Sequence, residues 1–354
     1  MKAAYYPFSF EGNKYSKIII ECIKNSGNEV LPFERVIKNR ELRNEVEIYY
    51  FNWIENIQAN NKFKMLSKFL LRVLLIKYLK FKNKKIIWTM HNRTPHDIET
   101  SKIVEFFMKF LVKASDKIII LSDESKNELL NFINLKEIDN KVFYIPHPNY
   151  IGEYPVISNI SDNESDSSIK LLFLGMIRRY KNIELIIDIA NHFKDKNIKF
   201  IIAGKPIDYN YEKELLNKIK SNNIETIFEF IEDKKMISLI NKSDALLLPY
   251  DIKSSMNSGT ILLAFSNKKT VISPMIGTLK DFNNKEFYFG YEYSTYDEHK
   301  KELIKTINKI TKIPKKEIEC MGRECYRLVE RNYNKEIITK RYIELNKSLV
   351  TNKE

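Results

Sequence analysis

The chain has 354 residues, of which 44% are hydrophobic and 30% charged, and its net charge is +13. This length suits two domains that each bury a core, and the composition excludes a disordered or membrane-spanning chain. The positive charge suggests an anionic partner, although a chain so rich in Lys, Asn and Ile can also owe it to coding bias.

The three cysteines, Cys22, Cys320 and Cys325, are too few for a disulfide framework in a chain of this length. They also lack the spacing of a zinc site, so we expect a reducing compartment and no metal centre. The N-terminus has no apolar run typical of a signal peptide, and no uninterrupted apolar segment reaches about 18 residues. We therefore expect a cytoplasmic protein that does not span a membrane.

Short β-branched apolar runs alternate with helical patterns along the whole chain. In the first half the runs are Lys2–Phe8, Val46–Ile54, Lys85–His91, Lys117–Ser122 and Lys141–His147. In the second half they are Lys170–Gly175, Lys199–Gly204, Ile227–Glu232, Asp244–Tyr250 and Thr270–Pro274. This alternation predicts an α/β protein with two doubly wound parallel sheets of roughly five strands each.

A polar stretch at residues 157–168, rich in Ser, Asp and Asn, interrupts the alternation and predicts a linker. It separates an N-terminal Rossmann-like domain, residues 1–156, from a C-terminal one, residues 169–334. The helical pattern of Lys335–Leu349 comes last, and we expect residues 335–354 to pack back on the first domain. Two such domains joined once predict a ligand site in a cleft at the carboxyl ends of their strands.

Three cations, Arg178, Arg179 and Lys181, follow the predicted strand that ends at Gly175 and directly precede a helical pattern. A helix start already carries partial positive charge, so cations are unfavourable there unless an anion is bound. Arginine forms forked hydrogen bonds to a diphosphate, and lysine adds a point charge. The turn therefore predicts a phosphate site, with a solvated basic turn as the alternative.

A second candidate anion site follows the strand that ends at Tyr250. Ser258, Gly259 and Thr260 open the next predicted helix. Small residues at a helix start let backbone N–H groups approach an anion closely. Ser258 taken alone is as consistent with an ordinary N-cap, but two such sites in one half of the chain favour a ligand.

In the first half, His91 ends a buried strand, and His96 and Asp97 follow it. An imidazole that titrates near neutrality, with a carboxylate close in sequence, suits acid–base chemistry or the binding of sugar hydroxyls. The cluster has no spaced third ligand for a metal. For His96 a purely structural role is equally open.

In this order the motifs resemble the nucleotide-sugar glycosyltransferases of the GT-B fold, particularly the glycosyl transferases group 1 of family 4. YFNWIEN (Tyr50–Asn56) and WTMHNRTPHD (Trp88–Asp97) look like a motif pair of a bacterial branch that builds surface polysaccharides. IPHPNY (Ile145–Tyr150) looks like its interdomain junction, and FLGMIRRYKN (Phe173–Asn182) looks like its donor motif. The resemblance spans nearly the whole chain.

The resemblance implies a hexosyltransferase that moves a sugar from a nucleotide diphosphate, with UDP favoured, to a glycan that is lipid-linked. The nucleotide sugar would be a substrate, and neither a cofactor nor a metal would be needed. Arg178 and Lys181 would stabilise the departing nucleotide. The same phosphates would be bound by residues bordering both strand ends, namely Gly175, Tyr250, Ser258, Gly259 and Thr260.

The resemblance also implies roles in the first domain. His91 would face the transferred sugar, and Gly12, Asn13 and His96 would lie on the acceptor side. Retention of the anomeric configuration is favoured. If the enzyme inverts instead, Asp97 is the carboxylate that would act as base.

The chain departs from the family pattern at three positions. A pair of glutamates that contacts sugar and ribose in the family is replaced here by Ser255 and Leu263. Asn182 stands where a glycine commonly follows the lysine. The missing glutamates put the ribose contact and the stereochemical assignment in doubt.

A basic segment lies between the two motifs of the first domain. From Asn56 to His96 there is no acidic residue, and ten cations occur: Lys62, Lys64, Lys68, Arg72, Lys77, Lys80, Lys82, Lys84, Lys85 and Arg93. Apolar residues fall between them at helical spacing: Phe63, Leu66, Phe69, Leu70, Val73, Leu74 and Leu75. Residues 62–85 are predicted to lie on an anionic membrane, so that the protein is peripheral on the inner face of the cell membrane. The alternative is a core-packing helix with a solvated charged face.

Three other functions stay open. A nucleotide-sugar epimerase of the same fold would change the sugar without an acceptor, and a non-catalytic glycosyltransferase-like partner protein would explain the missing glutamates. Nucleic-acid binding is disfavoured, because the cations are not interleaved with stacking aromatics on one sheet. We therefore expect no nucleic-acid partner.

Overall fold

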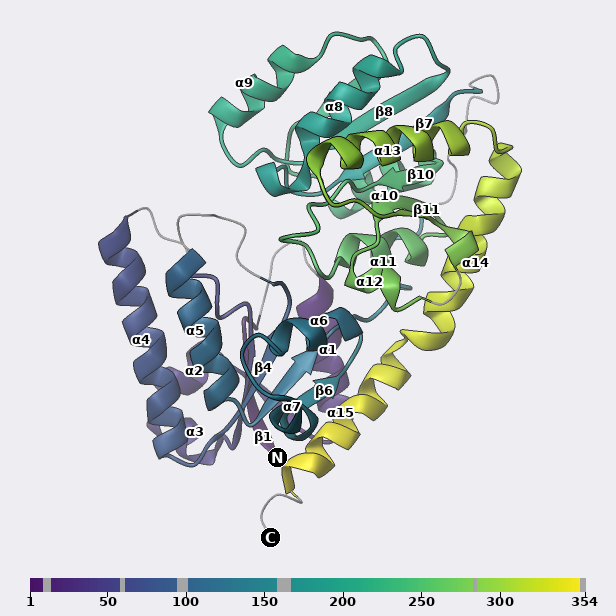
Figure 1. The fold of residues 1–354 in the computed structure, drawn as a ribbon. Helices are drawn as coiled ribbons and strands as arrows, with labels where there is room; N and C mark the ends of the chain where they lie inside the picture. The colour runs from purple at the N-terminus through teal and green to yellow at the C-terminus, as the bar shows by residue number, and fades with distance from the viewer. Residues whose placement is uncertain (9–13, 58–60, 94–100, 158–166, 283–284, 351–354) are drawn as a thin grey trace. The chain divides into compact units, whose positions relative to one another are not determined.

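The computed structural model describes residues 1–8, 14–57, 61–93, 101–157, 167–282 and 285–350 (Figure 1). The chain divides into two compact units, and each carries a six-stranded sheet whose strands all pair in parallel. Unit 1 comprises Met1–Pro148 and Lys335–Glu354, and unit 2 comprises Asn149–Asn334. The predicted α/β class with two Rossmann-like units is confirmed.

Unit 1 has the strand order β2-β1-β3-β4-β5-β6. Its strands are β1 (Lys2–Tyr6), β2 (Glu29–Pro32), β3 (Ile48–Asn52), β4 (Lys85–Met90), β5 (Lys117–Ile120) and β6 (Val142–Tyr144). Its helices are α1 (Lys14–Asn25), α2 (Phe33–Lys38), α3 (Arg40–Glu45), α4 (Lys62–Phe81), α5 (Ser101–Ala114), α6 (Asp123–Leu129), α7 (Leu135–Lys141) and α15 (Lys335–Val350). Strand order reverses between β1 and β3, which is the switch point of this sheet.

Successive buried residues of β3 show how the two faces of this sheet are covered. The Tyr50 ring lies against Tyr342 of α15, at 6.0 Å between centroids. Tyr49 and Phe51, its neighbours in the strand, lie against Phe33 of α2 instead. Because side chains of a strand alternate between faces, α15 and α2 cover opposite sides of the sheet. All three β3 residues are buried, so both faces contribute to the core.

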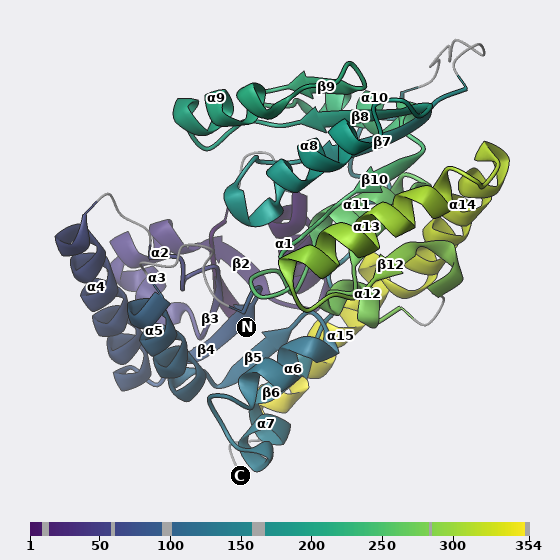
Figure 2. The ribbon, with the colours of Figure 1, turned by 45° about the horizontal axis from the view of Figure 1, so that its top comes forward.

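The last helix, α15, packs beside α1 in unit 1 (Figure 2). Lys335 forms an ion pair with Glu21 of α1 at 2.7 Å, and the Asn346 side chain donates to Ser26 Oγ at 3.1 Å. The Cys22 thiol contacts the Lys335 carbonyl oxygen. The segment predicted to return to the first domain is therefore a helix of that unit.

Unit 2 has the strand order β12-β11-β10-β7-β8-β9. Its strands are β7 (Ile169–Leu174), β8 (Ile198–Ala203), β9 (Ile224–Ile227), β10 (Ala245–Leu247), β11 (Thr270–Pro274) and β12 (Phe289–Tyr291). Its helices are α8 (Ile183–His192), α9 (Tyr209–Lys218), α10 (Asp233–Lys242), α11 (Gly259–Ser266), α12 (Gly277–Lys280), α13 (Tyr296–Ile310) and α14 (Lys315–Asn332), with 3-10 turns η2 (Arg179–Lys181) and η3 (Lys285–Phe287). Helix α8 packs beside α9 and α13, and α11 packs beside α14 (Figure 2).

The strand predictions were wrong in three places. Each sheet has six strands rather than five, because β2 and β12 were missed. Both are short edge strands, with the sequences EVLP and FGY, and they lack the β-branched apolar run that marked the other strands. The third strand of unit 2 is Ile224–Ile227, not Ile227–Glu232, because residues after Ile227 leave the sheet for the turn before α10.

The units separate at Pro148/Asn149, whereas the sequence placed residues up to 156 with the first domain. Hydrogen bonds hold this stretch to unit 2: the Asn149 side chain donates to the Val329 carbonyl at 2.8 Å, and the Tyr150 backbone N–H donates to Ser266 Oγ at 2.9 Å. Most of the predicted linker, residues 158–166, lies outside the described residues. No helix within the described ranges is both long and apolar enough to span a bilayer.

Candidate functional site

The switch point of unit 2 lies between β7 and β10, because strand order runs outward in opposite directions from this pair. In such sheets ligands bind beyond the carboxyl ends of the two strands at the switch. The loop after β7 carries Arg178 and Lys181, and the loop after β10 leads through Tyr250 to Ser258. Fold topology therefore brings together the two candidate anion sites that the sequence singled out.

Backbone contacts from the neighbouring β8 loop hold the loop after β7 in place. Ile177, which is fully buried, donates its N–H to the Lys205 carbonyl at 3.0 Å and accepts from the Ile207 N–H at 3.1 Å. Gly204 has φ +150°, and a Cβ there would lie 1.9 Å from the Gly175 carbonyl oxygen. Only glycine allows the two loops to approach this closely.

Asn182 joins this loop to the β10 side. Its side chain donates a hydrogen bond to the Pro249 carbonyl at 2.9 Å. Nearby, the Asp251 N–H donates to the Tyr180 carbonyl at 3.3 Å. Asn182 itself has φ 54° and ψ 45°, in the left-handed region. Asparagine is the residue besides glycine that tolerates this region best, so its replacement of the family's glycine keeps the backbone geometry and adds a hydrogen bond.

The three cations of the β7 loop have different surroundings. Arg179 is exposed and pairs with Glu214 at 2.7 Å and Glu184 at 3.6 Å, and its guanidinium lies over the Tyr211 ring. Arg178 and Lys181, in contrast, form no ion pair with any residue that the structure describes. The Arg178 Nε donates to the Met176 sulfur at 2.9 Å. Within the described ranges, two positive charges at the switch point therefore have no counter-charge.

Lys181 is partly buried, and its ammonium lies 5.7 Å from the Phe173 ring centroid. A Cβ at Gly175 would lie 3.0 Å from Lys181 Nζ, so the glycine, with φ +132°, leaves room for the ammonium at the strand end. Burial, and secondarily the charge of Arg178, lower the pKa of Lys181 to about 8. A bound anion would reverse this shift, because an opposite charge favours the protonated lysine.

Helix α11 presents its N-terminus to the same strand edge. Ser258 is its N-cap: its Oγ accepts from the Ile261 N–H at 3.3 Å and lies 3.0 Å from the Tyr250 hydroxyl. The Ser258 N–H donates to Thr278 Oγ1, so it is already satisfied. The next two N–H groups, of Gly259 and Thr260, have no intrahelical acceptor and can bind an anion. The predicted trio thus divides into a capping serine and two N–H donors.

In unit 1, His91 follows β4 directly and is buried, with 6% of its surface exposed. Its Nε2 lies 3.0 Å from Asn52 Oδ1 at the end of the adjacent strand β3. The Trp53 ring stacks on it at 4.0 Å between centroids, and Tyr15 lies edge-on at 5.2 Å. The two sequence motifs of the first half therefore meet, because β3 and β4 are neighbours in the sheet.

His91 and His147, whose rings both lie against Tyr15, are uncharged at neutral pH. Burial, and then the nearby His147, hold the pKa of His91 well below its usual range. Burial also lowers the pKa of His147 to about 4, although its bond to the Pro148 carbonyl raises it. A neutral imidazole can exchange hydrogen bonds with a hydroxyl but cannot form an ion pair with phosphate.

A buried carboxylate also lies near the end of β3. Glu55 accepts a hydrogen bond from Trp88 Nε1 at 3.0 Å. Arg72 of α4 donates to the carbonyl oxygens of Ile54 and Asn56 on either side of it. Burial raises the pKa of Glu55 to about 7, while the Trp88 bond and the Arg72 charge oppose the rise. In the sequence, Glu55 stands inside the motif YFNWIEN and had no predicted role of its own.

Four of the predicted residues, Gly12, Asn13, His96 and Asp97, lie outside the described part of the chain. The positions of the missing glutamate pair are described: Ser255 is buried in the β10 loop, and Leu263 is buried in α11. Among the described residues, no three His, Cys, Asp or Glu side chains gather closely enough to hold a metal.

The sequence analysis also missed residues that position the site. Gly204 lies against Gly175, Pro249 accepts from Asn182, and Thr278 of α12 accepts from the Ser258 N–H. A glycine at the end of KFIIAG was the only available signal, because the other two contacts join segments distant in sequence.

Residues 158–321 match the family model of the glycosyl transferases group 1. This span contains the β7 loop, the β10 loop and the start of α11. Unit 2 therefore belongs to the glycosyl transferases group 1. Within this group 1 unit lie Arg178 and Lys181, which have no ion pair among the described residues, and the two N–H donors of α11.

A curated relative is the GDP-mannose:glycolipid 4-beta-D-mannosyltransferase of Xanthomonas campestris pv. campestris, which is 27% identical over 106 residues. The match spans only 30% of this chain and 30% of the relative.

Solved structures resemble the chain over nearly its whole length. HepE of Anabaena, in complex with UDP and glucose, has a TM-score of 0.70 at 13% identity and covers 99% of this chain and 100% of its own. A glycosyltransferase of Rickettsia africae has a TM-score of 0.59 at 18% identity and covers 97% and 84%. At these identities the likeness establishes the fold alone: each unit is a parallel sheet with helices, as in the GT-B fold that the motifs predicted.

Proposed function

We propose that this protein is a glycosyltransferase that moves a hexose from a nucleotide diphosphate to a glycan acceptor. The observation that carries the proposal is the pair Arg178 and Lys181, which have no acidic partner among the described residues and lie at the switch point of the group 1 unit. The N–H groups of Gly259 and Thr260 open the neighbouring helix. A diphosphate supplies the negative charge that this arrangement lacks.

In the proposed reaction the diphosphate is the leaving group. Negative charge grows on its oxygens as the bond to the sugar breaks, and fixed positive charge stabilises that growth. Arg178 provides forked hydrogen-bond donors. Lys181 provides a positive charge, and its ammonium group holds its proton more firmly once the diphosphate is bound. On this proposal the protein needs no added metal, so a chelator leaves the rate unchanged.

We propose UDP as the nucleotide, since the HepE structure named above was solved with UDP and glucose. GDP-mannose is the second candidate, because it is the donor named for the Xanthomonas campestris relative. The same relative acts on a glycolipid, which supports a lipid-linked glycan as acceptor here. Binding of UDP and GDP by calorimetry, and turnover of a panel of UDP- and GDP-sugars, distinguish the donors.

For unit 1 we propose that neutral His91 hydrogen-bonds a hydroxyl of the transferred sugar, and that Gly12, Asn13 and His96 contact the acceptor. We propose retention of configuration; if the product is inverted, Asp97 is the proposed base. The anomeric configuration of the product, compared with that of the donor, decides between the two.

The test of the donor site uses three single variants that each remove one charge: Arg178→Gln, Lys181→Gln and, as matched control, Arg179→Gln. The first two should weaken nucleotide binding by about tenfold or more, the value of a lost charge-assisted hydrogen bond. The control should bind almost as wild type, because Arg179 is neutralised by Glu214 and Glu184. Equal affinities for all three variants would contradict the assignment.

Product analysis separates this proposal from its rivals. A transferase releases nucleotide and joins the sugar to an added glycan, whereas an epimerase returns a changed nucleotide sugar without an acceptor. A non-catalytic partner protein yields neither product.

We further propose that the protein works at the inner face of the cell membrane and binds it through residues 62–85. Helix α4 carries large apolar side chains on its solvent side, and lysines flank them. A lipid-linked acceptor would then be concentrated where the enzyme lies.

A further inference from the structure

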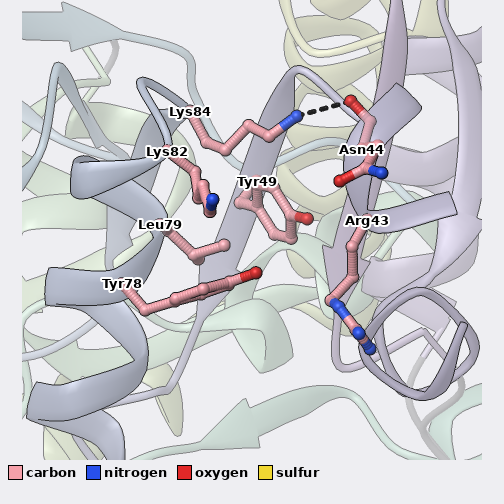
Figure 3. A pocket seen from close by; sticks show the side chains of 7 residues that line it. All are labelled: Arg43, Asn44, Tyr49, Tyr78, Leu79, Lys82 and Lys84. Carbon is pink, nitrogen blue, oxygen red and sulfur yellow. Dashed lines mark hydrogen bonds between the residues drawn. The ribbon is translucent and has the colours of Figure 1, made fainter. Parts of the chain in front are cut away.

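A small pocket lies in unit 1 at the amino ends of strands β3 and β4 (Figure 3). Its volume is about 190 Å³, and it is lined by Arg43, Asn44, Tyr49, Tyr78, Leu79, Lys82 and Lys84. The cluster of His91 and Asn52 occupies the opposite, carboxyl ends of the same strands. The pocket is therefore separate from the residues proposed for sugar transfer.

The lining is strongly positive. Three of the seven residues are cations, from the end of α3 and from the segment between α4 and β4, and none is acidic. Lys84 donates to the Asn44 carbonyl at 2.7 Å, and Arg43 donates to the Ile37 carbonyl, so both side chains are fixed. Burial lowers the pKa of Lys84, with Lys82 adding to the effect and the exposed Glu47 opposing it. A bound anion would offset this unfavourable charge.

The decisive feature is the Tyr49 hydroxyl. Tyr49 is 0% exposed, and its oxygen is buried without any hydrogen-bond partner. Figure 3 shows it directed into the pocket, on the side where Arg43 and Asn44 lie. An unsatisfied buried hydroxyl costs about 1–3 kcal/mol, and a ligand oxygen that accepts a hydrogen bond from it would remove this cost. Burial raises the pKa of Tyr49 to about 12, and the hydroxyl therefore remains a donor.

These donors suit a phosphate group. Three cations and the hydroxyls of Tyr49 and Tyr78 line the pocket without a carboxylate among the lining residues, and phosphate offers several acceptor oxygens to them. The pocket volume corresponds to about six water molecules at roughly 30 Å³ each, which is sufficient for the five heavy atoms of a phosphate.

The surface beside the pocket indicates where the phosphate comes from. On the solvent side of α4, five side chains form an apolar stripe: Phe63, Leu70, Leu71, Leu74 and Phe81, with exposures of 80%, 49%, 66%, 62% and 80%. Tyr78 connects the two features, because it lines the pocket and is 43% exposed on the same helix. Lys82 lies 5.6 Å from the Phe81 ring, at the junction of stripe and pocket. Apolar residues bordered by cations are typical of helices that lie at an anionic lipid surface.

We propose that the pocket of Arg43, Tyr49, Lys82 and Lys84 binds the phosphate of an anionic lipid head group while the stripe of α4 enters the bilayer surface. The proposal rests on the membrane association proposed above and not on the transfer reaction. We assign the stripe to lipid rather than to a second copy of the chain or to another protein. Helix α4 and the pocket lining contain no acidic residue, and a bilayer supplies both the apolar and the anionic groups that they would bind.

The experiment measures co-sedimentation with vesicles of phosphatidylcholine alone or mixed with phosphatidic acid. The triple variant Arg43→Gln/Lys82→Gln/Lys84→Gln removes the pocket charges, and Lys24→Gln/Lys113→Gln/Lys136→Gln is its control, with equal charge loss at exposed sites of unit 1 that do not line the pocket. Each pocket cation should contribute about fivefold to binding of the mixed vesicles. Tyr49→Phe keeps the shape and total charge, so its expected loss of about tenfold reports the hydroxyl alone even if the triple variant folds poorly.

Three results would overturn the proposal. If both triple variants lose the same affinity, vesicle binding is general charge attraction. If inorganic phosphate binds in a Tyr49-dependent way while vesicles do not, the ligand is soluble. If light scattering shows a dimer that Leu74→Gln dissociates, the stripe is covered by a second copy. Nucleotide affinity is measured separately without vesicles, so failure here leaves the donor site untouched and the reverse also holds.

Discussion

The Asn182 side chain donates a hydrogen bond to the Pro249 carbonyl oxygen at 2.9 Å, and this bond joins the loop after β7 to the loop after β10. It fixes the residue that directly follows Lys181, at the switch point of the sheet. The two halves of the candidate donor site are therefore held together by the protein itself. Because a preorganised site of this kind is already ordered, less free energy is spent on ordering it when the ligand binds.

The first prediction concerns Asn182. Asn182→Gly loses the bond to Pro249 but suits the left-handed backbone. Asn182→Ala also loses the bond, and its Cβ remains in a region that costs about 1–2 kcal/mol without the polar side chain that makes asparagine tolerant of it. Urea unfolding should rank wild type, glycine variant and alanine variant in falling order of stability. Nucleotide affinity should fall in the same order, because Lys181 moves with its neighbour. An alanine variant as stable as the glycine variant would contradict the assigned backbone geometry.

The second prediction concerns the contact of Gly204 with Gly175. In Gly204→Ala the new Cβ would meet the Gly175 carbonyl oxygen at 1.9 Å, so the two loops must separate. Gly27→Ala is the matched control, since Gly27 also has a positive φ of +93° but nothing lies within 4 Å of its Cβ. Both variants incur backbone strain of about 1–3 kcal/mol, and only the first adds a clash. We expect Gly204→Ala to unfold at clearly lower urea concentration and to bind nucleotide poorly.

These contacts also show what sequence reasoning could and could not provide. Strand–helix alternation and the FLGMIRRYKN pattern were enough to locate β7, α8, α11 and the loops that carry the two candidate anion sites, because these features are local. The different surroundings of Arg178 and Arg179 were not visible, since they depend on Glu214, about 35 residues further on. The pocket around Tyr49 was missed for the same reason: its cations come from α3 and from the segment between α4 and β4, and they look like solvated charges in the sequence.

The third prediction is a pH dependence of nucleotide binding. Because the pKa of Lys181 is about 8 in the free protein, the lysine loses its proton as pH rises through that value. Affinity for UDP should be constant just below pH 7 and should fall by up to about tenfold per pH unit above about 8. Lys181→Arg keeps its charge and should show no fall. Arg178→Gln removes a neighbouring positive charge, so its fall should shift to higher pH.

The fourth prediction links Glu55 to stability. Its folded-state pKa of about 7 lies above the ordinary value of 4.5, so the folded protein holds the proton more firmly than the unfolded chain does. The contribution of Glu55 is therefore complete below pH 4.5 and is lost as pH rises to about 7, by roughly 3 kcal/mol.

Glu55→Gln tests this directly, because the amide oxygen can still accept from Trp88 Nε1. The free energy of unfolding of the variant minus that of wild type should increase between pH 4.5 and 7 and then stay constant. Taking the difference removes the titration of all other groups. A difference that does not change with pH would mean that Glu55 is ionised throughout this range.

The last prediction concerns the apolar stripe of α4. Leu71→Gln/Leu74→Gln replaces two leucines that are 66% and 62% exposed, so the free energy of unfolding should hardly change. Binding to anionic vesicles should fall at least tenfold, since each leucine that leaves water contributes up to about 1.5–3 kcal/mol. Leu130→Gln/Leu135→Gln is the control, with leucines 43% and 64% exposed in the segment of α6 and α7. If this control weakens vesicle binding as much as the α4 variant does, general hydrophobic adsorption, rather than a helix oriented at the bilayer, explains the interaction.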